Sequence, residues 1–92
     1  MGKPEKYVEK YLTEQARERG FCHFKFLSGD NGVPDRIIIG NGHTIFVEAK
    51  SDKGTISELQ KRRIRHIIEN GGEACVVSSR DEVDALFETI TA

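Results

Sequence analysis

Residues 32–50 of this chain, GVPDRIIIGNGHTIFVEAK, decide its fold. Two runs rich in β-branched and apolar residues, 37–39 and 44–49, flank the dipeptide Asn41-Gly42. Asn-Gly is typical of a two-residue type I′ turn, because both central residues of that turn need positive φ. The stretch therefore predicts an antiparallel β-hairpin.

A two-residue turn fixes the register of this hairpin, so that Asp35 faces Glu48 across the two strands. Side chains alternate along a strand, and Lys50 therefore shares a face with these two carboxylates. Carboxylates whose Cβ atoms lie about 5 Å apart repel each other. Lys50 supplies one compensating charge, and Mg²⁺, which binds one or two carboxylates with phosphate oxygens and water, would supply two more. A three-residue turn would remove the opposition; with Asn-Gly as the turn, the sequence predicts half of a metal site.

The same stretch resembles a known nuclease signature. Pro34-Asp35, followed after twelve residues by Glu48-Ala49-Lys50, is similar to the PD-(D/E)xK motif. The combination of GVPDR (32–36), FVEAK (46–50) and Gln60 in a following helix more closely resembles the VRR-NUC domains, the virus-type replication-repair nucleases. Among these, the small stand-alone members of phages are the most similar, and the resemblance covers nearly the whole chain.

The resemblance implies a metal-dependent endonuclease that hydrolyses DNA phosphodiester bonds with Mg²⁺ or Mn²⁺. It also implies selectivity for branched DNA such as Holliday junctions, a homodimer, and the cytoplasm of a bacterial or phage-infected cell. The catalytic residues implied are Glu9, Asp35, Glu48, Lys50 and Gln60. Of these, Asp35 and Glu48 would hold the metal, and Glu9 would complete the acidic cluster.

The acid of the first helix has two candidates. Residues 5–19 predict a helix, and Glu5 and Glu9 both lie in its first half. An acid near a helix N-terminus usually serves the helix dipole, which accounts for Glu5 well and for Glu9 in part. By the resemblance, the spacing before Gly20 favours Glu9 as the site residue, while Glu5 stays an alternative.

Gln60 also has two interpretations. Ser57 and Gln60 have the spacing of a capping box that opens a helix over residues 57–70. The residues alone favour this cap, whereas the resemblance favours a place in the active site. One conformation of Gln60 cannot fill both roles.

A basic cluster follows in the same helix, over residues 61–66. The formal net charge of the chain is −1, which does not by itself indicate nucleic-acid binding. With the resemblance, we expect Lys61, Arg62 and Lys53 to contact DNA. Arg36 is suited either to DNA or to an ion pair with a nearby acid, and the sequence leaves both open.

The chain has 92 residues, of which 32% are charged and 37% hydrophobic, as expected for a single globular domain over 1–92. It has no apolar run of the roughly 20 residues that span a bilayer, so we expect no membrane contact. Its two cysteines lack metal-ligand spacing, and we expect both to be reduced thiols.

Strands over 21–27 and 73–78 and a last helix over 79–90 complete the order α-β-β-β-α-β-α. The fold class expected is α/β, a mixed four-stranded sheet flanked by helices, which matches the resolvase-like restriction-endonuclease core. Apolar residues on both hairpin faces predict that helices or a partner subunit cover both sides. Two other functions stay open: a nucleic-acid-binding module that does not cleave, and a small α/β protein-interaction domain.

Overall fold

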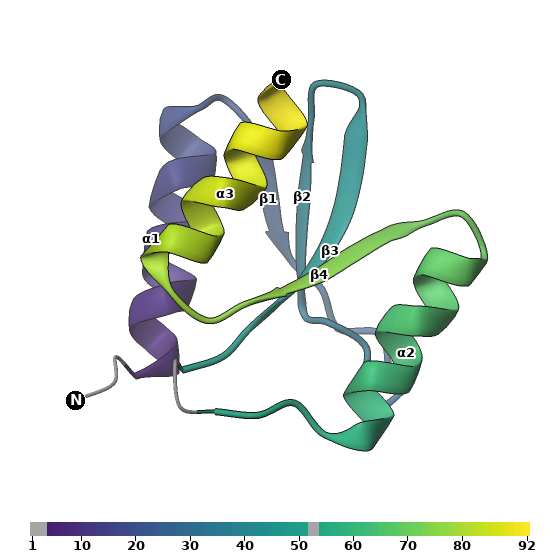
Figure 1. Cartoon of the computed structure of the whole chain (residues 1–92). Coiled ribbons are helices and arrows are strands. Elements are labelled where there is room, and N and C mark those ends of the chain that lie inside the picture. Colours follow the sequence, from purple (N-terminus) through teal and green to yellow (C-terminus); the bar gives the residue numbers. More distant parts are fainter. Residues whose placement is uncertain (1–3, 52–53) are drawn as a thin grey trace.

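The computed structural model describes residues 4–51 and 54–92 and confirms the predicted fold class (Figure 1). Its elements, in chain order, are α1 (Glu5–Glu18), β1 (Cys22–Lys25), β2 (Arg36–Gly40), β3 (His43–Ala49), α2 (Glu58–Glu69), β4 (Glu73–Val77) and α3 (Arg80–Thr91). The first strand is shorter than predicted, because the chain leaves the regular ladder after Lys25 and enters a long loop.

The hairpin of β2 and β3 has the register that its turn predicts. Arg36 pairs with Val47 at one end of the ladder, and Gly40 pairs with His43 at the other. Asn41 has a φ of 49° and the following glycine a φ of 82°, as a type I′ turn requires.

The four strands form one sheet in the order β1-β2-β3-β4. The pairs β1–β2 and β2–β3 are antiparallel, whereas β4 runs parallel to β3. A parallel pair needs a crossover connection, and α2 provides it (Figure 1). The sheet is therefore mixed, as predicted.

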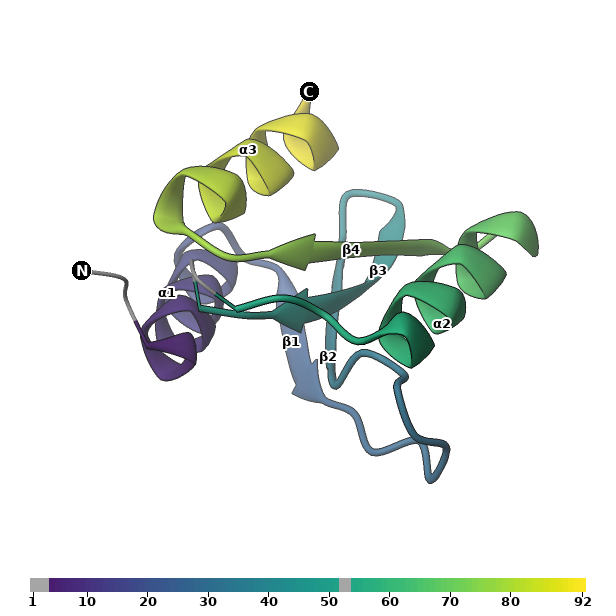
Figure 2. The same cartoon turned by 60° about the horizontal axis from the view of Figure 1, so that its bottom comes forward.

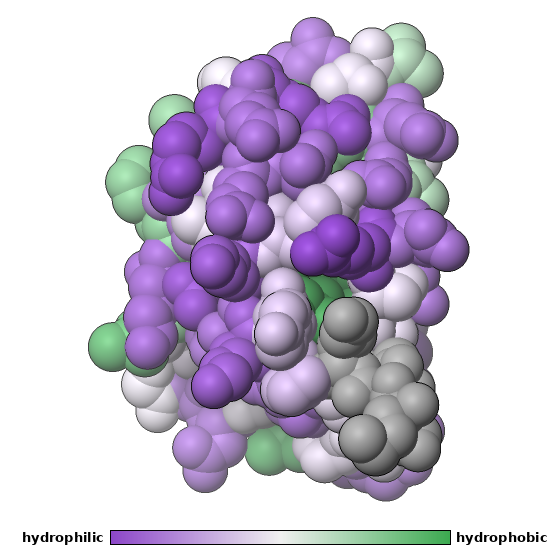
Figure 3. All heavy atoms as spheres, turned by 90° about the vertical axis from the view of Figure 1, so that its left-hand side faces the viewer, coloured by the Kyte–Doolittle hydropathy of each residue, from purple (hydrophilic) through white to green (hydrophobic). Residues whose placement is uncertain are grey.

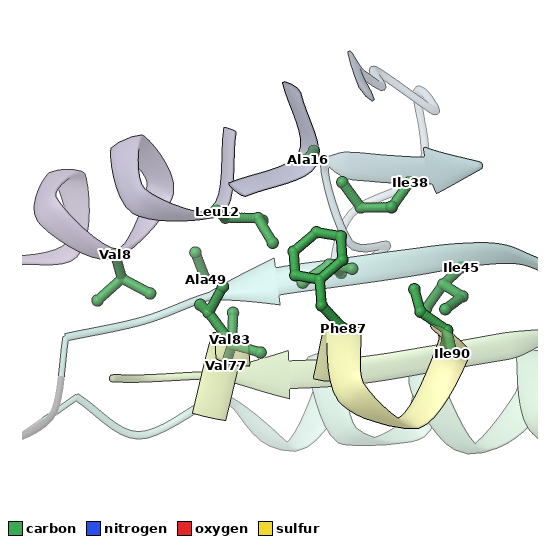
Figure 4. Close-up of a cluster of buried hydrophobic side chains, with 11 residues drawn as sticks. Val8, Leu12, Ala16, Ile38, Ile45, Ala49, Val77, Val83, Phe87 and Ile90 are labelled. Carbon is green, nitrogen blue, oxygen red and sulfur yellow. The ribbon is translucent and has the colours of Figure 1, made fainter. Parts of the chain in front are cut away.

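Helices α1 and α3 cover one face of the sheet and enclose the core (Figure 4). Apolar residues recur every fourth position along α1, so that one stripe of the helix faces the sheet. The buried side chains are Val8, Leu12, Ala16, Ile38, Ile45, Val47, Ala49, Val77, Val83, Phe87 and Ile90. The side of the molecule that carries α1 is mostly hydrophilic on its outer surface (Figure 3).

The opposite face of the sheet is covered only in part. Helix α2 packs against β4, and none of its twelve residues is fully buried. On β1 and β2, Phe24 keeps 56% and Ile39 keeps 37% of its surface exposed. Among the described residues, helices thus cover one sheet face well and leave an apolar area on the other. No helix in those ranges is both long and apolar enough to cross a bilayer.

Candidate active site

Asp35 and Glu48 lie at the end of the hairpin away from its turn. The ladder of β2 and β3 ends at the pair Arg36–Val47, and Asp35 and Glu48 are the next residues outward. The main-chain N–H of Phe26 donates to the Asp35 carbonyl at 2.7 Å, which ties this end of the hairpin to the residues after β1. The register is therefore the one that predicted the opposition of the two acids.

Glu48 is a buried carboxyl, with 8% of its surface exposed. Burial, which disfavours the charged form, is the main cause that raises its pKa to about 7. The Asp35 carboxylate raises the pKa further, and Glu5 and Glu9 add to the effect, while Lys50 opposes it. Negative charge from Asp35, just before β2, and from two acids of α1 therefore acts on Glu48.

Lys50 and Glu5 stand beside this carboxyl. The Lys50 ammonium lies 4.0 Å from the Glu5 carboxylate, and the Lys50 main chain is fixed by a 2.9 Å hydrogen bond to the carbonyl of Val77. Partial burial raises the pKa of Glu5, and Glu9 and Asp35 raise it further, although Lys50 lowers it. The single positive charge of Lys50 therefore does not neutralise all the acids around it.

Glu9 and Arg36 form an ion pair. The Arg36 Nη2 donates to Glu9 Oε2 at 3.1 Å, and both side chains are mostly buried. Of the two alternatives for Arg36, the structure contains the ion pair with a nearby acid. The Nε of Arg36 is buried and has no hydrogen-bond partner among the described residues. Glu9 therefore approaches the site with its charge partly compensated, whereas Glu5 faces Lys50.

These residues fit a divalent cation. Within residues 4–51 and 54–92, no three His, Cys, Asp or Glu side chains stand close enough to form a ready-made metal site. Mg²⁺ needs fewer protein ligands than that, because it keeps water and binds substrate phosphates. A buried carboxyl whose pKa is raised by neighbouring acids marks a place where a cation is favourable, and Asp35 and Glu48 offer the hard oxygen ligands.

Gln60 occupies the capping box that its spacing predicts. The Ser57 main-chain N–H donates to Gln60 Oε1 at 2.8 Å, and the Gln60 N–H donates to Ser57 Oγ at 3.1 Å. The side-chain oxygen of Gln60 is therefore engaged in this conformation. A catalytic role for Gln60 stays a prediction and requires release of this cap.

Two of the basic residues predicted to contact DNA, Lys61 and Arg62, lie on α2, which carries neither Asp35 nor Glu48. Lys61 is exposed on α2 and pairs with Glu58 at 3.3 Å, and Arg62 is exposed one position further on. Lys53 lies outside the described residues.

Sequence reasoning missed one contact next to the site. Arg63, predicted only as part of a basic cluster, donates from Nε to the carbonyl of Asn31 at 3.0 Å, in the loop that leads to Asp35. The signal in the sequence is Gly32, whose lack of a side chain lets this loop approach α2.

Comparisons with known proteins agree with this geometry, although no family model matches the chain. Over 76 residues the chain is 36% identical to "Putative nuclease p44" of Acyrthosiphon pisum secondary endosymbiont phage 1, covering 80% of this chain and 82% of that protein. A solved structure described as "VRR_NUC domain" superimposes with a TM-score of 0.82 at 30% identity, over 91% of this chain and 94% of the other. With this fold, and with Asp35, Glu48 and Lys50 gathered at one end of the hairpin, the chain belongs to the VRR-NUC family of nucleases.

Proposed function

We propose that this nuclease is a metal-dependent endonuclease that hydrolyses DNA phosphodiester bonds, and that it selects branched DNA such as Holliday junctions. The observation that carries the metal dependence is the buried Glu48 carboxyl, whose pKa is raised to about 7 by burial and by neighbouring acids, Asp35 first among them. Such a group is poised to hold a cation, since a divalent ion would relieve both the desolvation and the repulsion.

Asp35 and Glu48 would hold one or two Mg²⁺ or Mn²⁺ ions, and Glu9 would add to the cluster directly or through water. When bound, the ion supplies polarisation of the phosphate and a lower pKa for the attacking water. Lys50 would donate to the phosphate oxygens, where negative charge grows during the reaction, or position the attacking water. Glu5, 4.0 Å from the Lys50 ammonium, would orient that ammonium.

The exposed side of α2 supplies the DNA contacts in this proposal. A surface hollow there is lined by Arg62, Arg63, Arg65, His66 and Glu69. Arg62 has no ion-pair partner among the residues that the structure describes, so its charge is available to a phosphate. Phosphate contacts release counterions, and we therefore expect DNA affinity to fall steeply as salt rises from about 50 to 200 mM.

A homodimer would place two such sites around a two-fold axis, like the two strands that are cut in a four-way junction. The apolar area around Phe24 and Ile39 supports this part of the proposal, because a second subunit would remove it from water. Phe24→Ser should then weaken the dimer and lower junction cleavage. Sedimentation at micromolar concentration measures the assembly, and a wild-type monomer that cuts junctions at paired, symmetric positions would refute it.

Cleavage of matched linear, flap, splayed and four-way DNA with Mn²⁺, with Mg²⁺ and with EDTA tests the activity. Wild type should cut the four-way substrate fastest, and only with metal. Asp35→Asn and Glu48→Gln should each lose cleavage and Mn²⁺ affinity measured by calorimetry, yet keep DNA binding. Glu88→Gln, which changes an exposed acid of α3, is the matched control. Wild-type cleavage by both site variants would refute the assignment.

The cellular setting that we propose is the cytoplasm of a bacterial or phage-infected cell, where branched DNA arises during replication and repair. The phage origin of the relative "Putative nuclease p44" supports this setting.

A further inference from the structure

The loop that brings Asp35 to the site lies against α2 (Figure 2). It leaves β1 after Lys25 and enters β2 at Arg36, so Asp35 stands at the end of a loop and not inside a strand. Its main-chain carbonyl is held by the N–H of Phe26 at 2.7 Å. This bond fixes the Asp35 main chain on the side of β1, and the residues that precede Asp35 contact α2.

Two contacts fix the middle of this loop. The Arg63 Nε donates to the carbonyl of Asn31 at 3.0 Å. At the next residue, Gly32 has a φ of +84°, and a Cβ there would lie 2.7 Å from Leu59 Cγ and 3.3 Å from Arg63 Cγ. The loop backbone thus rests directly on the side chains of α2, at a position that only glycine fits.

Helix α2 is in turn fixed relative to Glu48. It packs against β4, and β4 pairs with β3 through Glu48–Val76 and Ala49–Val77. The hydrogen bond from Arg63 to Asn31 therefore joins the segment that carries Asp35 to the part of the fold that carries Glu48.

We propose that Arg63 is a positioning residue, which sets the approach of Asp35 to Glu48 through the carbonyl of Asn31. Asp35, at the end of a glycine-containing loop, and Glu48, on β3, carry like charges that repel each other, and a loop free to move would let them separate. The hydrogen bond from Arg63 opposes that separation. The effect of Arg63 on metal binding rests on the proposed function. The hydrogen bond from Arg63 to Asn31, called the tether below, concerns only the loop and α2.

A matched pair of variants isolates the hydrogen bond. Arg63→Gln places a side-chain N–H at the position of the arginine Nε, while Arg63→Met has a similar length and no donor. Both variants remove the charge, and both residues are good helix formers. Any difference between them therefore reports the bond to Asn31 and not a contact of Arg63 with DNA. Lys10→Gln, at an exposed position of α1 with no role in the proposed site, controls for the loss of one positive charge.

Hydrogen exchange without metal should show faster exchange of the amides of residues 31–33, 35 and 36 in Arg63→Met than in Arg63→Gln or wild type. Calorimetry should show a Mn²⁺ affinity about 10- to 100-fold lower for Arg63→Met, the range usual for groups that orient metal ligands. The kcat on saturating DNA should fall in the same range. Arg63→Gln should lie closer to wild type than Arg63→Met in Mn²⁺ affinity and in kcat, and Lys10→Gln should match wild type in exchange, Mn²⁺ affinity and kcat.

If the loop amides exchange at the same rate in Arg63→Met and Arg63→Gln, the hydrogen bond to Asn31 does not hold the loop, and the tether is refuted. If Arg63→Met shows faster exchange of the loop amides but keeps the Mn²⁺ affinity and kcat of wild type, Arg63 does not position Asp35. A wild-type protein that neither binds Mn²⁺ nor cleaves would instead refute the proposed function, and the exchange comparison would then decide the tether alone.

Discussion

Glu48→Gln should make the metal-free protein more stable at alkaline pH while it removes activity. Burial and the nearby Asp35 raise the pKa of Glu48 to about 7, from an ordinary value of 4.5. An acid whose pKa is raised in the folded state favours folding while it is neutral, and this contribution is lost as pH rises through the folded pKa. Wild type should therefore lose stability between about pH 4.5 and 7, and the glutamine variant should not lose this part.

The size of the effect follows from the two pKa values. One pKa unit corresponds to about 1.36 kcal/mol, so the change from 4.5 to about 7 corresponds to about 3 kcal/mol above pH 7. Glu48 is 8% exposed, so solvent screens little of this energy. At pH 5 the same linkage leaves a difference of less than about 1 kcal/mol, because this pH lies close to the ordinary pKa of 4.5 and protonation of Glu48 in the unfolded chain costs little.

Urea denaturation of wild type and Glu48→Gln, in EDTA and at about pH 5, 6, 7 and 8, measures this difference. Added Mn²⁺ should stabilise wild type at pH 8 and narrow the gap, since a ligand of the folded state stabilises it by mass action. The exposed control Glu88→Gln should stay within about 0.5 kcal/mol of wild type. A glutamine variant no more stable than wild type at pH 8, or a gap that does not shrink toward pH 5, would refute the reasoning.

Three further predictions concern Lys50, Gln60 and Arg36. Lys50→Ala should keep Mn²⁺ affinity by calorimetry but lower kcat by about 100-fold, as loss of a donor to developing charge does; unchanged kcat would contradict its role. Gln60→Glu preserves the capping box with Ser57, so its melting temperature should stay within about 2 °C of wild type while most cleavage is lost. Full activity would show that Gln60 is a cap alone. Arg36→Met leaves Glu9 without its partner and should lower the free energy of unfolding by about 1 to 3 kcal/mol in urea denaturation, a result absent if the pair contributes nothing.

The register of the hairpin could be predicted because one local feature determines it. Asn41-Gly42 restricts the turn to a conformation with two positive φ values, and the facing residues then follow by counting. The opposition of Asp35 and Glu48 is a consequence of that count. For this reason the position of these two acids opposite each other could be predicted from the sequence.

The contacts around these two carboxylates could not be predicted from the sequence in the same way. Whether Glu5 or Glu9 points to Glu48 depends on the rotation of α1 over the sheet, and the ion pair of Glu9 with Arg36 has no local sequence signal. The bond of Arg63 to Asn31 joins residues 32 positions apart through a main-chain carbonyl, so no pattern of side-chain types marks it. These contacts depend on how the elements pack, which periodicity does not fix.

The same contacts explain why a small fold accepts an acidic cluster at the end of its central hairpin. Glu48 sits among carboxylates in a place where burial already disfavours its charge, so by itself it weakens the metal-free fold. Arg36 and Lys50 each approach one of the helix acids, at 3.1 and 4.0 Å, and leave Asp35 and Glu48 without an ion-pair partner among the described residues. In the proposed function these two acids bind the divalent ion, and Glu9 adds to the cluster directly or through water. We therefore expect a bound divalent ion to relieve the repulsion at Glu48 that Arg36 and Lys50 leave in the metal-free fold.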